Sequence, residues 1–195
     1  MKRMQKALAG RLTSVTLVAE ATYLRHNLNA MVRTAEAFGL CEVHFISPLN
    51  APDGVKRPSS SAARGAERWI NLRNHSNTEH CLINLKKDGY RLWIADFQEG
   101  ALPPSAVPVS DPVALVVGTE LTGVSPAARS MADGFVAIPM HGLTRSLNVS
   151  VATACILQHV SERRRMLLGG GDLPMERQQE LLRLWMQREG SGCPE

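Results

Sequence analysis

Three short segments of the sequence combine amide, hydroxyl, charged and glycine residues in patterns that suit a ligand-binding site. In the first, residues 26–39, the side chains of Asn29, Arg33 and Glu36 share one face of a predicted helix. A structural explanation is also open: Asn27 could cap this helix, and Arg33 and Glu36 could form a surface ion pair one turn apart. The segment alone does not decide between the two.

The second segment, residues 116–125, leads from a buried strand into a loop that contains Gly118 and Gly123. A short helix follows, with Ser125 and Pro126 at its start. Loops that follow parallel strands hold the ligands of many α/β proteins, and glycines let the backbone approach a ligand closely. The spacing matches neither a dinucleotide-binding fingerprint nor a phosphate-binding loop, so it predicts a ligand without naming its class.

The third segment, residues 138–152, passes from a strand end through a loop with Gly142 into an apolar helix. Ser146 and Asn148 stand where this helix begins. Serine at such a place is commonly an N-cap, and asparagine two positions later commonly has a structural role. Both side chains are therefore candidates for capping as well as for the site.

These segments must be positioned by an α/β domain, because short apolar runs alternate along the chain with helical patterns. We expect a mainly parallel sheet flanked by helices, and a loop at residues 58–64. The predicted strands are residues 15–19, 43–47, 92–97, 114–118 and 135–138, and the predicted helices are residues 26–39, 78–88, 126–132, 147–167 and 174–189. One domain should span residues 1–195, with the basic segment 1–14 and the helix 174–189 as extensions.

The composition is that of a globular protein, since 44% of the residues are hydrophobic, 21% are charged and the net charge is +4. No apolar run approaches the roughly 18 residues that cross a membrane, and the N-terminal stretch lacks the core of an export signal. The 4 cysteines include no closely spaced pair that would bind zinc. We therefore expect a cytoplasmic protein with reduced thiols and no metal.

Positive charge is concentrated in two clusters, one made of Lys2, Arg3, Lys6 and Arg11 and the other of residues 163–165. Such clusters could contact the phosphates of a polyanion, because binding there releases counterions. Solvated helix faces would give the same pattern.

The three segments, in this order and at these distances, resemble motifs 1, 2 and 3 of the TrmH/SpoU branch of the SPOUT RNA methyltransferases. The run 146–152 after residues 138–140 is especially similar to that branch. Similarity extends from about residue 17 to residue 165 and includes residues 42–44 and 65–69. Each segment is a weak signal by itself, whereas all three in register are a specific one.

The resemblance implies an α/β SPOUT fold whose C-terminal part is threaded into a deep trefoil knot, and a homodimer that completes each active site across its interface. It also implies that the knot binds S-adenosylmethionine. The positions that match the family's cofactor pocket are Ala95, Gly118, Glu120, Ile138 and Leu147. No metal is expected to take part.

The resemblance further implies that Arg33 is the catalytic arginine and that Asn27, Glu120, Ser146 and Asn148 complete the catalytic site. A ribose 2′-hydroxyl is a poor nucleophile at neutral pH, so its proton must be removed or shared during attack. Arginine normally stays protonated, which makes it an unusual general base. Two roles stay open: Arg33 as the base, or charged Arg33 stabilising the forming alkoxide and holding the neighbouring phosphate.

The implied activity is methylation of a ribose 2′-hydroxyl of RNA, with the D-loop guanosine of tRNA as the expected target. The basic residues Lys2, Arg3, Lys6 and Arg11 are then expected to contact RNA phosphates. Ribosomal RNA or another tRNA position is an alternative target. A knotted RNA-binding protein with weak catalysis is a further alternative, and binding of S-adenosylmethionine would argue against it.

Overall fold

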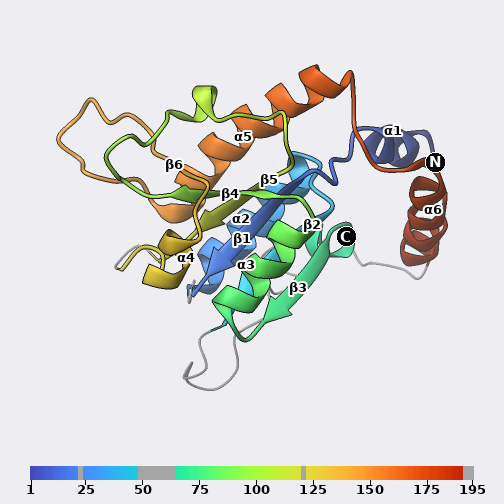
Figure 1. Cartoon of the computed structure of the whole chain (residues 1–195). Coiled ribbons are helices and arrows are strands. Elements are labelled where there is room, and N and C mark those ends of the chain that lie inside the picture. Colours follow the sequence, from blue (N-terminus) through green and yellow to red (C-terminus); the bar gives the residue numbers. More distant parts are fainter. Residues whose placement is uncertain (22–23, 48–64, 120–121, 191–195) are drawn as a thin grey trace.

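The computed structural model describes residues 1–21, 24–47, 65–119 and 122–190 of the chain. Six strands form one sheet in the order β3-β2-β1-β5-β4-β6, and every pairing between them is parallel (Figure 1). The strands are β1 (Val15–Glu20), β2 (Glu42–Ile46), β3 (Asn71–His75), β4 (Arg91–Ala95), β5 (Val113–Val117) and β6 (Gly134–Val136). The predicted α/β class with a parallel sheet is confirmed, and the predicted loop at residues 58–64 lies outside the described residues.

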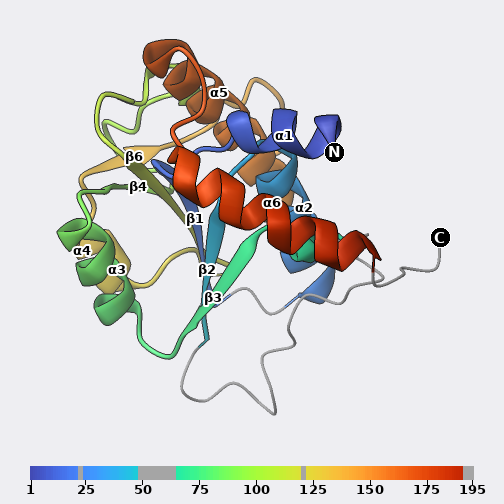
Figure 2. The same ribbon diagram turned by 90° about the vertical axis from the view of Figure 1, so that its right-hand side faces the viewer.

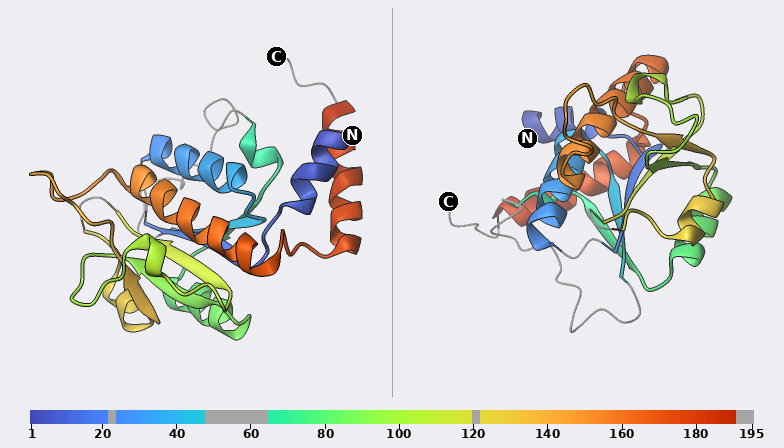
Figure 3. Two further views of the ribbon diagram at one scale, coloured as in Figure 1. Left: turned by 90° about the horizontal axis from the view of Figure 1, so that it is seen from above. Right: turned by 90° about the vertical axis from the view of Figure 1, so that its left-hand side faces the viewer.

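Helices cover both faces of this sheet (Figure 3). Helices α2 (Arg25–Ala37) and α5 (Val149–Leu168) pack against each other on one face. Helices α3 (Thr78–Lys87) and α4 (Pro126–Ser130) pack against each other on the opposite face. Two short 3-10 turns, η1 (Ala66–Arg68) and η2 (Pro104–Ala106), lie in the connections.

Helices α1 (Lys2–Ala9) and α6 (Met175–Gly190) lie side by side away from these layers (Figure 2). A small apolar cluster of Met4, Leu8, Leu173 and Trp185 joins them. No helix in the described ranges is long and apolar enough to cross a membrane.

The central strands β1 and β5 are buried at every position; the unbroken apolar sequence of β5 predicts this, whereas β1 also buries the polar Thr16 and Glu20. Alternate side chains enter different cores. Leu17 of β1 and Leu115 of β5 belong to the core under α2 and α5, whereas Val18 and Val116 belong to the core under α3 and α4. A parallel sheet covered on both faces places its polar side chains at the strand ends, where the three segments of interest begin.

Local sequence explains where several helices begin and end. Ser125 caps α4 by accepting a hydrogen bond from the backbone N–H of Ala128 at 3.1 Å, and Pro126 is the first helical residue, as predicted. Asn77 caps α3 in the same way by accepting from His80 N at 2.8 Å. Gly39 follows α2 with a φ of +74°, the left-handed conformation that glycine adopts without strain.

Two elements escaped the sequence analysis, the helix α1 and the strand β3. The strand Asn71–His75 is the sheet's edge, and its sequence lacks an apolar alternation; backbone pairing with β2 and polar contacts of Arg73 and His75 with that strand hold it in place. Helix α1 has two buried side chains, Met4 and Leu8, whose partners lie in the C-terminal third of the chain. Neither element carries a local pattern strong enough to predict it.

Arg11 is not part of an exposed basic surface, and the prediction that it contacts RNA phosphates is wrong for this chain. Its side chain is 2% exposed, and its guanidinium donates to the carbonyl of Leu40 at 2.5 Å and to Glu36 Oε1 at 2.8 Å. The guanidinium also lies 5.1 Å from the ring centre of Trp185. Arg11 therefore joins α2 to α6.

The arginines of the second basic cluster, residues 163–165, form intramolecular hydrogen bonds with backbone carbonyls. They make neither a phosphate site nor a solvated face. Arg164 is buried and donates to the carbonyls of Val109 and Ser110 at 2.6 and 2.7 Å. Arg163 donates to the carbonyl of Val107 at 2.5 Å, and Arg165 donates to the carbonyl of Gly10 at 3.0 Å. Backbone carbonyls without other partners attract arginines at these places, which net charge cannot reveal.

Asp172 fixes the segment after α5 to the beginning of β1. Its carboxylate accepts hydrogen bonds from the backbone N–H and the hydroxyl of both Thr13 and Ser14, with the Thr13 hydroxyl at 2.9 Å and the Ser14 N–H at 3.1 Å. Burial opposes ionisation of Asp172, but the hydrogen bonds from Ser14 and Thr13 outweigh it and lower the pKa below its ordinary value.

Candidate active site

A cavity of about 220 Å³ opens where β4, β5 and β6 end. Four of the five residues predicted to bind a cofactor line it, namely Ala95, Gly118, Ile138 and Leu147. The fifth, Glu120, lies outside the described residues. The second and third segments of the sequence analysis thus meet around one hollow, at the edge of the sheet where α/β proteins place ligands.

Gly118 is the point at which the second segment turns back on itself. The backbone N–H groups of Thr119 and Gly123 each donate to the carbonyl of the other residue at 3.1 Å. A Cβ added to Gly118 would lie 2.1 Å from the carbonyl oxygen of Gly123 and 2.4 Å from Val124 N. Since both obstacles are backbone atoms, this position excludes every side chain. The turn is a tight wall of the cavity.

The cavity wall is largely apolar, with one ion pair at its side. Val117, Val136 and Ile156 are buried side chains of the wall. Asp96 follows β4 and accepts a hydrogen bond from Arg129 Nε of α4 at 2.7 Å. The combination suits a flat apolar group held by backbone and a few polar contacts.

The first and third segments are joined by a hydrogen bond between two amides. Asn148 Nδ2 donates to Asn27 Oδ1 at 3.1 Å, so α5 is tied to the first turn of α2. Asn148 Oδ1 also accepts from the N–H of Ser150 at 2.9 Å and therefore caps α5. The N-cap is Asn148 and not Ser146, which instead lines the cavity. Nor is Asn27 a cap, because α2 begins earlier, with Leu24 at its N-cap.

Arg33 lies apart from the cavity in this single chain. It is exposed on α2 and lines a separate hollow together with Arg25, His26, Asn29, Ala30 and Thr34. The expected surface pair with Glu36 is replaced, because Glu36 pairs with Arg11 at 2.8 Å. The structure therefore brings Asn27, Asn148 and Ser146 toward the cavity and leaves Arg33 outside it.

The basic side chains at the start of the chain divide into an exposed and a buried set. Lys2, Arg3 and Lys6 are exposed on α1 and are available to a polyanion. Arg11 is buried, as described above. The exposed charges lie on the helix that packs against α6.

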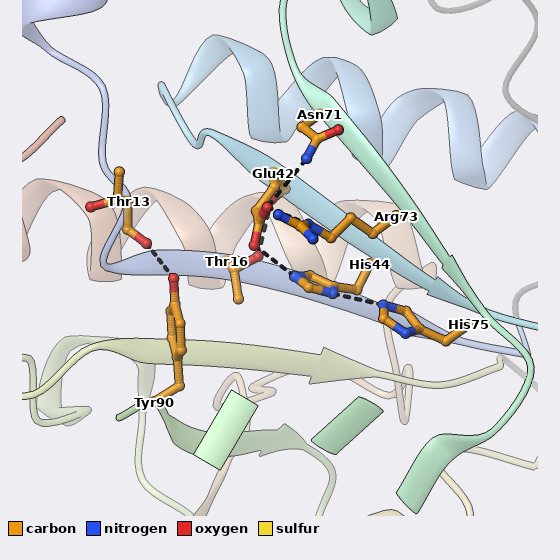
Figure 4. A network of polar contacts seen from close by, with 8 residues as sticks. All are labelled: Thr13, Thr16, Glu42, His44, Asn71, Arg73, His75 and Tyr90. Atoms are coloured by element: carbon orange, nitrogen blue, oxygen red, sulfur yellow. Dashed lines mark hydrogen bonds and ion pairs between the residues drawn. The ribbon is translucent and has the colours of Figure 1, made fainter. Parts of the chain in front are cut away.

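A polar network between the neighbouring strands β2 and β3 was missed by the sequence analysis (Figure 4). Glu42 accepts hydrogen bonds from Arg73 Nε at 2.7 Å and from His44 Nε2 at 3.1 Å, and His44 Nδ1 lies 2.9 Å from His75 Nε2. The hydrogen bond from His44, against the effect of burial and with help from Arg73, lowers the pKa of Glu42 to about 2. Burial lowers the pKa of His75, and His44 and Arg73 lower it further.

The alternation of Glu42 and His44 along β2 was the one available signal for this network, because residues two apart share a sheet face. His75 could not be added, since the strand that carries it was itself missed. The same face receives Tyr90, whose hydroxyl donates to the carbonyl of Thr13, and Thr16, whose hydroxyl donates to the carbonyl of Glu42 at 3.0 Å (Figure 4).

Comparisons with known proteins agree with the resemblance of the three segments. The profile of the SpoU rRNA Methylase family matches residues 14–158. The tRNA (guanosine(18)-2′-O)-methyltransferase of Thermus thermophilus is 33% identical over 190 residues, which are 96% of this chain and 95% of that protein. The crystal structure of the A. aeolicus TrmH/SpoU tRNA modifying enzyme has a TM-score of 0.84 at 29% identity and covers 96% of this chain and 95% of that chain. The SpoU methyltransferase AviRb of Streptomyces viridochromogenes, crystallised with AdoMet, shares the fold with a TM-score of 0.69 at 22% identity, over 80% of this chain and 62% of that chain.

Proposed function

Because the chain belongs to the SpoU rRNA Methylase family, we propose that it transfers a methyl group from S-adenosylmethionine to a ribose 2′-hydroxyl of RNA. The D-loop guanosine of tRNA is the target that the Thermus thermophilus relative supports, since that protein is named for guanosine 18. The observation that carries the proposal is the cavity at the ends of β4, β5 and β6, which Gly118 and Leu147 line from two of the family's motifs. The amide pair of Asn27 and Asn148 connects the remaining motif to it.

The cavity fits S-adenosylmethionine in shape and in chemistry. Its apolar wall, with Ile138, Leu147 and Ala95, suits the faces of an adenine ring. The closed turn at Gly118 shapes one wall of the cavity, because the backbone of Gly123 occupies the space that a Cβ at this position would need. When bound, this cofactor supplies a methyl group on a positively charged sulfur.

The residues of the chain then have to position the ribose and to remove or share the proton of its 2′-hydroxyl. Ser146 lines the cavity and can accept or donate a hydrogen bond to the ribose or its phosphate. Asn148 holds the start of α5, and with it Ser146, in a fixed place against Asn27. Arg33, as base or as charged stabiliser, acts on the 2′-oxygen and the adjacent phosphate. Much of the rate arises from aligning the oxygen with the methyl group.

A homodimer completes this site. Arg33 lines a hollow of its own, so the cavity of one chain lacks it. Leu24, before α2, and Leu147 and Val151, at the start of α5, are 50%, 36% and 48% exposed, so apolar surface is available there to a partner chain. A two-fold partner that covers them would supply its Arg33 to the cavity.

The threading of the C-terminal part of the domain into a deep trefoil knot, as the family resemblance implies, also belongs to this proposal. The 0.84 TM-score with the A. aeolicus enzyme supports a common path of the chain. A cytoplasmic location is supported by the thiols of Cys41, Cys81 and Cys155, all of which are free.

The deciding experiment incubates the purified chain with unmodified tRNA and methyl-labelled S-adenosylmethionine, and then locates the label by nuclease digestion. Label on the ribose of the D-loop guanosine supports the whole proposal. Label elsewhere in tRNA, or only on ribosomal RNA, keeps the chemistry and replaces the target. Absence of label together with absence of cofactor binding contradicts the proposal and favours an RNA-binding module.

A further inference from the structure

Three side chains with metal-binding atoms meet on the sheet face that carries α3. They are His44 of β2, His75 at the end of β3 and Cys81 of α3. One ring nitrogen of each histidine and the sulfur of Cys81 all lie within 4.8 Å of one another. This cluster belongs to the β3 end of the sheet, and β1 separates it from the cavity strands β5, β4 and β6.

Each ring offers its converging nitrogen as a metal ligand once the hydrogen bond between the two rings is exchanged for a metal ion. His44 Nε2 is occupied by Glu42 at 3.1 Å, which leaves Nδ1 as the available nitrogen of that ring. This Nδ1 lies 2.9 Å from Nε2 of His75, and the two rings are nearly parallel, at an angle of 16°. A carboxylate on the far side of a histidine is the arrangement that orients metal-bound imidazoles.

Two of the three side chains are buried, which distinguishes the cluster from side chains that meet by chance on the surface. His44 is 5% exposed and Cys81 is 1% exposed, whereas His75 lies partly open at the edge strand. A metal ion can therefore enter from the solvent at His75 and reach two ligands in the interior. Imidazole and thiolate together favour zinc over the hard cations magnesium and calcium.

We propose that His44, His75 and Cys81 bind a zinc ion, with a fourth position left to water. Zinc holds nitrogen at about 2.0–2.1 Å and sulfur at about 2.3 Å, so its ligand atoms stand roughly 3.3–3.6 Å apart. The two ring nitrogens must separate slightly and the sulfur must approach, by movements of about 1 Å or less that side-chain rotation supplies. The proton between the rings moves to the outer nitrogen of His75, and the Cys81 thiol releases its proton to water.

Such an ion would be structural. It would join the edge strand β3 to β2 and to α3, in a part of the sheet where side-chain packing is weak, since β3 has no fully buried side chain. Binding to the folded chain alone raises its stability by mass action. The inference stands independently of methyl transfer, because it uses none of the residues of the cavity.

The test uses the full chain, stripped with a chelator and then given zinc or cobalt(II). We expect about one zinc ion to stay with each chain after desalting, and the thermal unfolding midpoint to rise with zinc. Cobalt should give a thiolate-to-metal charge-transfer band. His75→Gln and Cys81→Ser should each lose the retained zinc and the rise in midpoint, and Cys81→Ser should also lose the band.

Two matched variants control for other ligands: His80→Gln, an exposed histidine of α3, and Cys155→Ser, an exposed thiol on α5. Both should bind zinc as the unmodified chain does. The proposal is overturned if the unmodified chain retains no zinc, or if His75→Gln retains as much as the His80→Gln control. Because His75 is partly exposed, its variant decides the matter even where Cys81→Ser fails to fold.

Discussion

Asn148 donates a hydrogen bond to Asn27 at 3.1 Å and so ties the helix that follows the cavity loop to the first turn of α2. Asn27 is 1% exposed, so loss of this partner leaves a buried amide oxygen with fewer hydrogen bonds. We expect Asn27→Ala and Asn148→Ala each to lower methyl-transfer turnover by about tenfold.

The double variant Asn27→Ala/Asn148→Ala separates this link from other effects of either residue. If the two single losses of stability were simply added, the double variant would be less stable than we expect it to be. Its measured free energy of unfolding, from chemical denaturation, should exceed that additive value by about 1 kcal/mol. Strict additivity would show that the two side chains act independently. The exposed Asn74 of β3, changed to alanine, is the matched control.

Arg33 is exposed on α2 and makes no contribution to the cavity wall, so its replacement should leave cofactor binding unchanged. Arg33→Ala should lower turnover by about 100- to 1000-fold, the usual cost of a group that stabilises a transition state. Calorimetric titration with S-adenosylmethionine and a single-turnover methylation assay measure the two effects. Turnover close to that of the unmodified chain would remove Arg33 from the mechanism.

The proposed homodimer makes a sharper prediction when two inactive variants are mixed. Arg33→Ala keeps an intact cavity, whereas Gly118→Ala keeps an intact Arg33. If each site takes Arg33 from the partner, hybrid dimers contain one complete site, and an equal mixture should recover about a quarter of the original activity. Recovery close to zero after verified subunit exchange would place both groups of a site in one chain.

Gly118 excludes a side chain because an added Cβ would lie 2.1 Å from a backbone oxygen. Gly118→Ala should therefore displace the turn and weaken S-adenosylmethionine binding at least about tenfold. Gly142, in the loop before α5, has no atom within 4 Å of the equivalent position and serves as the control. Equal affinity of the two variants in equilibrium dialysis would show that this turn is no part of the cofactor site.

Asp172 predicts a specific loss of stability in acid. Its folded pKa lies below the ordinary value of 3.8, so its contribution is fully present above that pH and disappears as the pH falls through the folded pKa. Asp172→Asn should lower the free energy of unfolding by about 1–3 kcal/mol at neutral pH and flatten its dependence on pH below about 4. Denaturant titrations between pH 7 and acid, with the exposed Glu99→Gln as control, measure both.

Replacing the basic residues of the N-terminal segment should affect either RNA binding or stability, depending on whether the residue is exposed or buried. Changing the exposed Lys2, Arg3 and Lys6 together to glutamine should weaken tRNA binding and reduce the slope of log affinity against log salt by about 2 to 3. Arg11→Ala should instead lower the free energy of unfolding by about 3 kcal/mol, because Arg11 is buried against Glu36. A salt slope unchanged in the triple variant would assign α1 to packing alone.

The parallel sheet and the cavity could be predicted because both depend on local sequence. The unbroken apolar run of β5, followed by Gly118, predicts a buried strand that ends at a ligand-binding loop. The residues matched to a cofactor pocket were assigned by resemblance, and the structure places Ala95, Gly118, Ile138 and Leu147 around one hollow. The rule that ligands bind at the carboxyl ends of parallel strands agrees with that placement, but the choice of residues came from the resemblance.

The tertiary roles of charged residues could not be predicted. Arg11 and Arg164 read as surface charges, yet each finds backbone carbonyls from segments far away in the sequence. The position of Arg33 outside the cavity is a similar case, since it depends on how α2 is placed in the fold and not on the local sequence. The cluster of His44, His75 and Cys81 depends on an edge strand that has no apolar pattern of its own.

The pairing of α1 with α6 has a consequence for how the molecule is made. Met4 and Leu8 share their apolar cluster with Leu173 and Trp185, so the helix that leaves the ribosome early completes this cluster only when most of the chain has been synthesised. The sheet and its two helical layers can assemble in the meantime, because all six strands and the helices α2 to α5 precede α6 in the sequence. The helix that carries Lys2, Arg3 and Lys6 is therefore among the last parts to dock, and a nascent chain would acquire its methyl-transfer fold before its basic helix is in place.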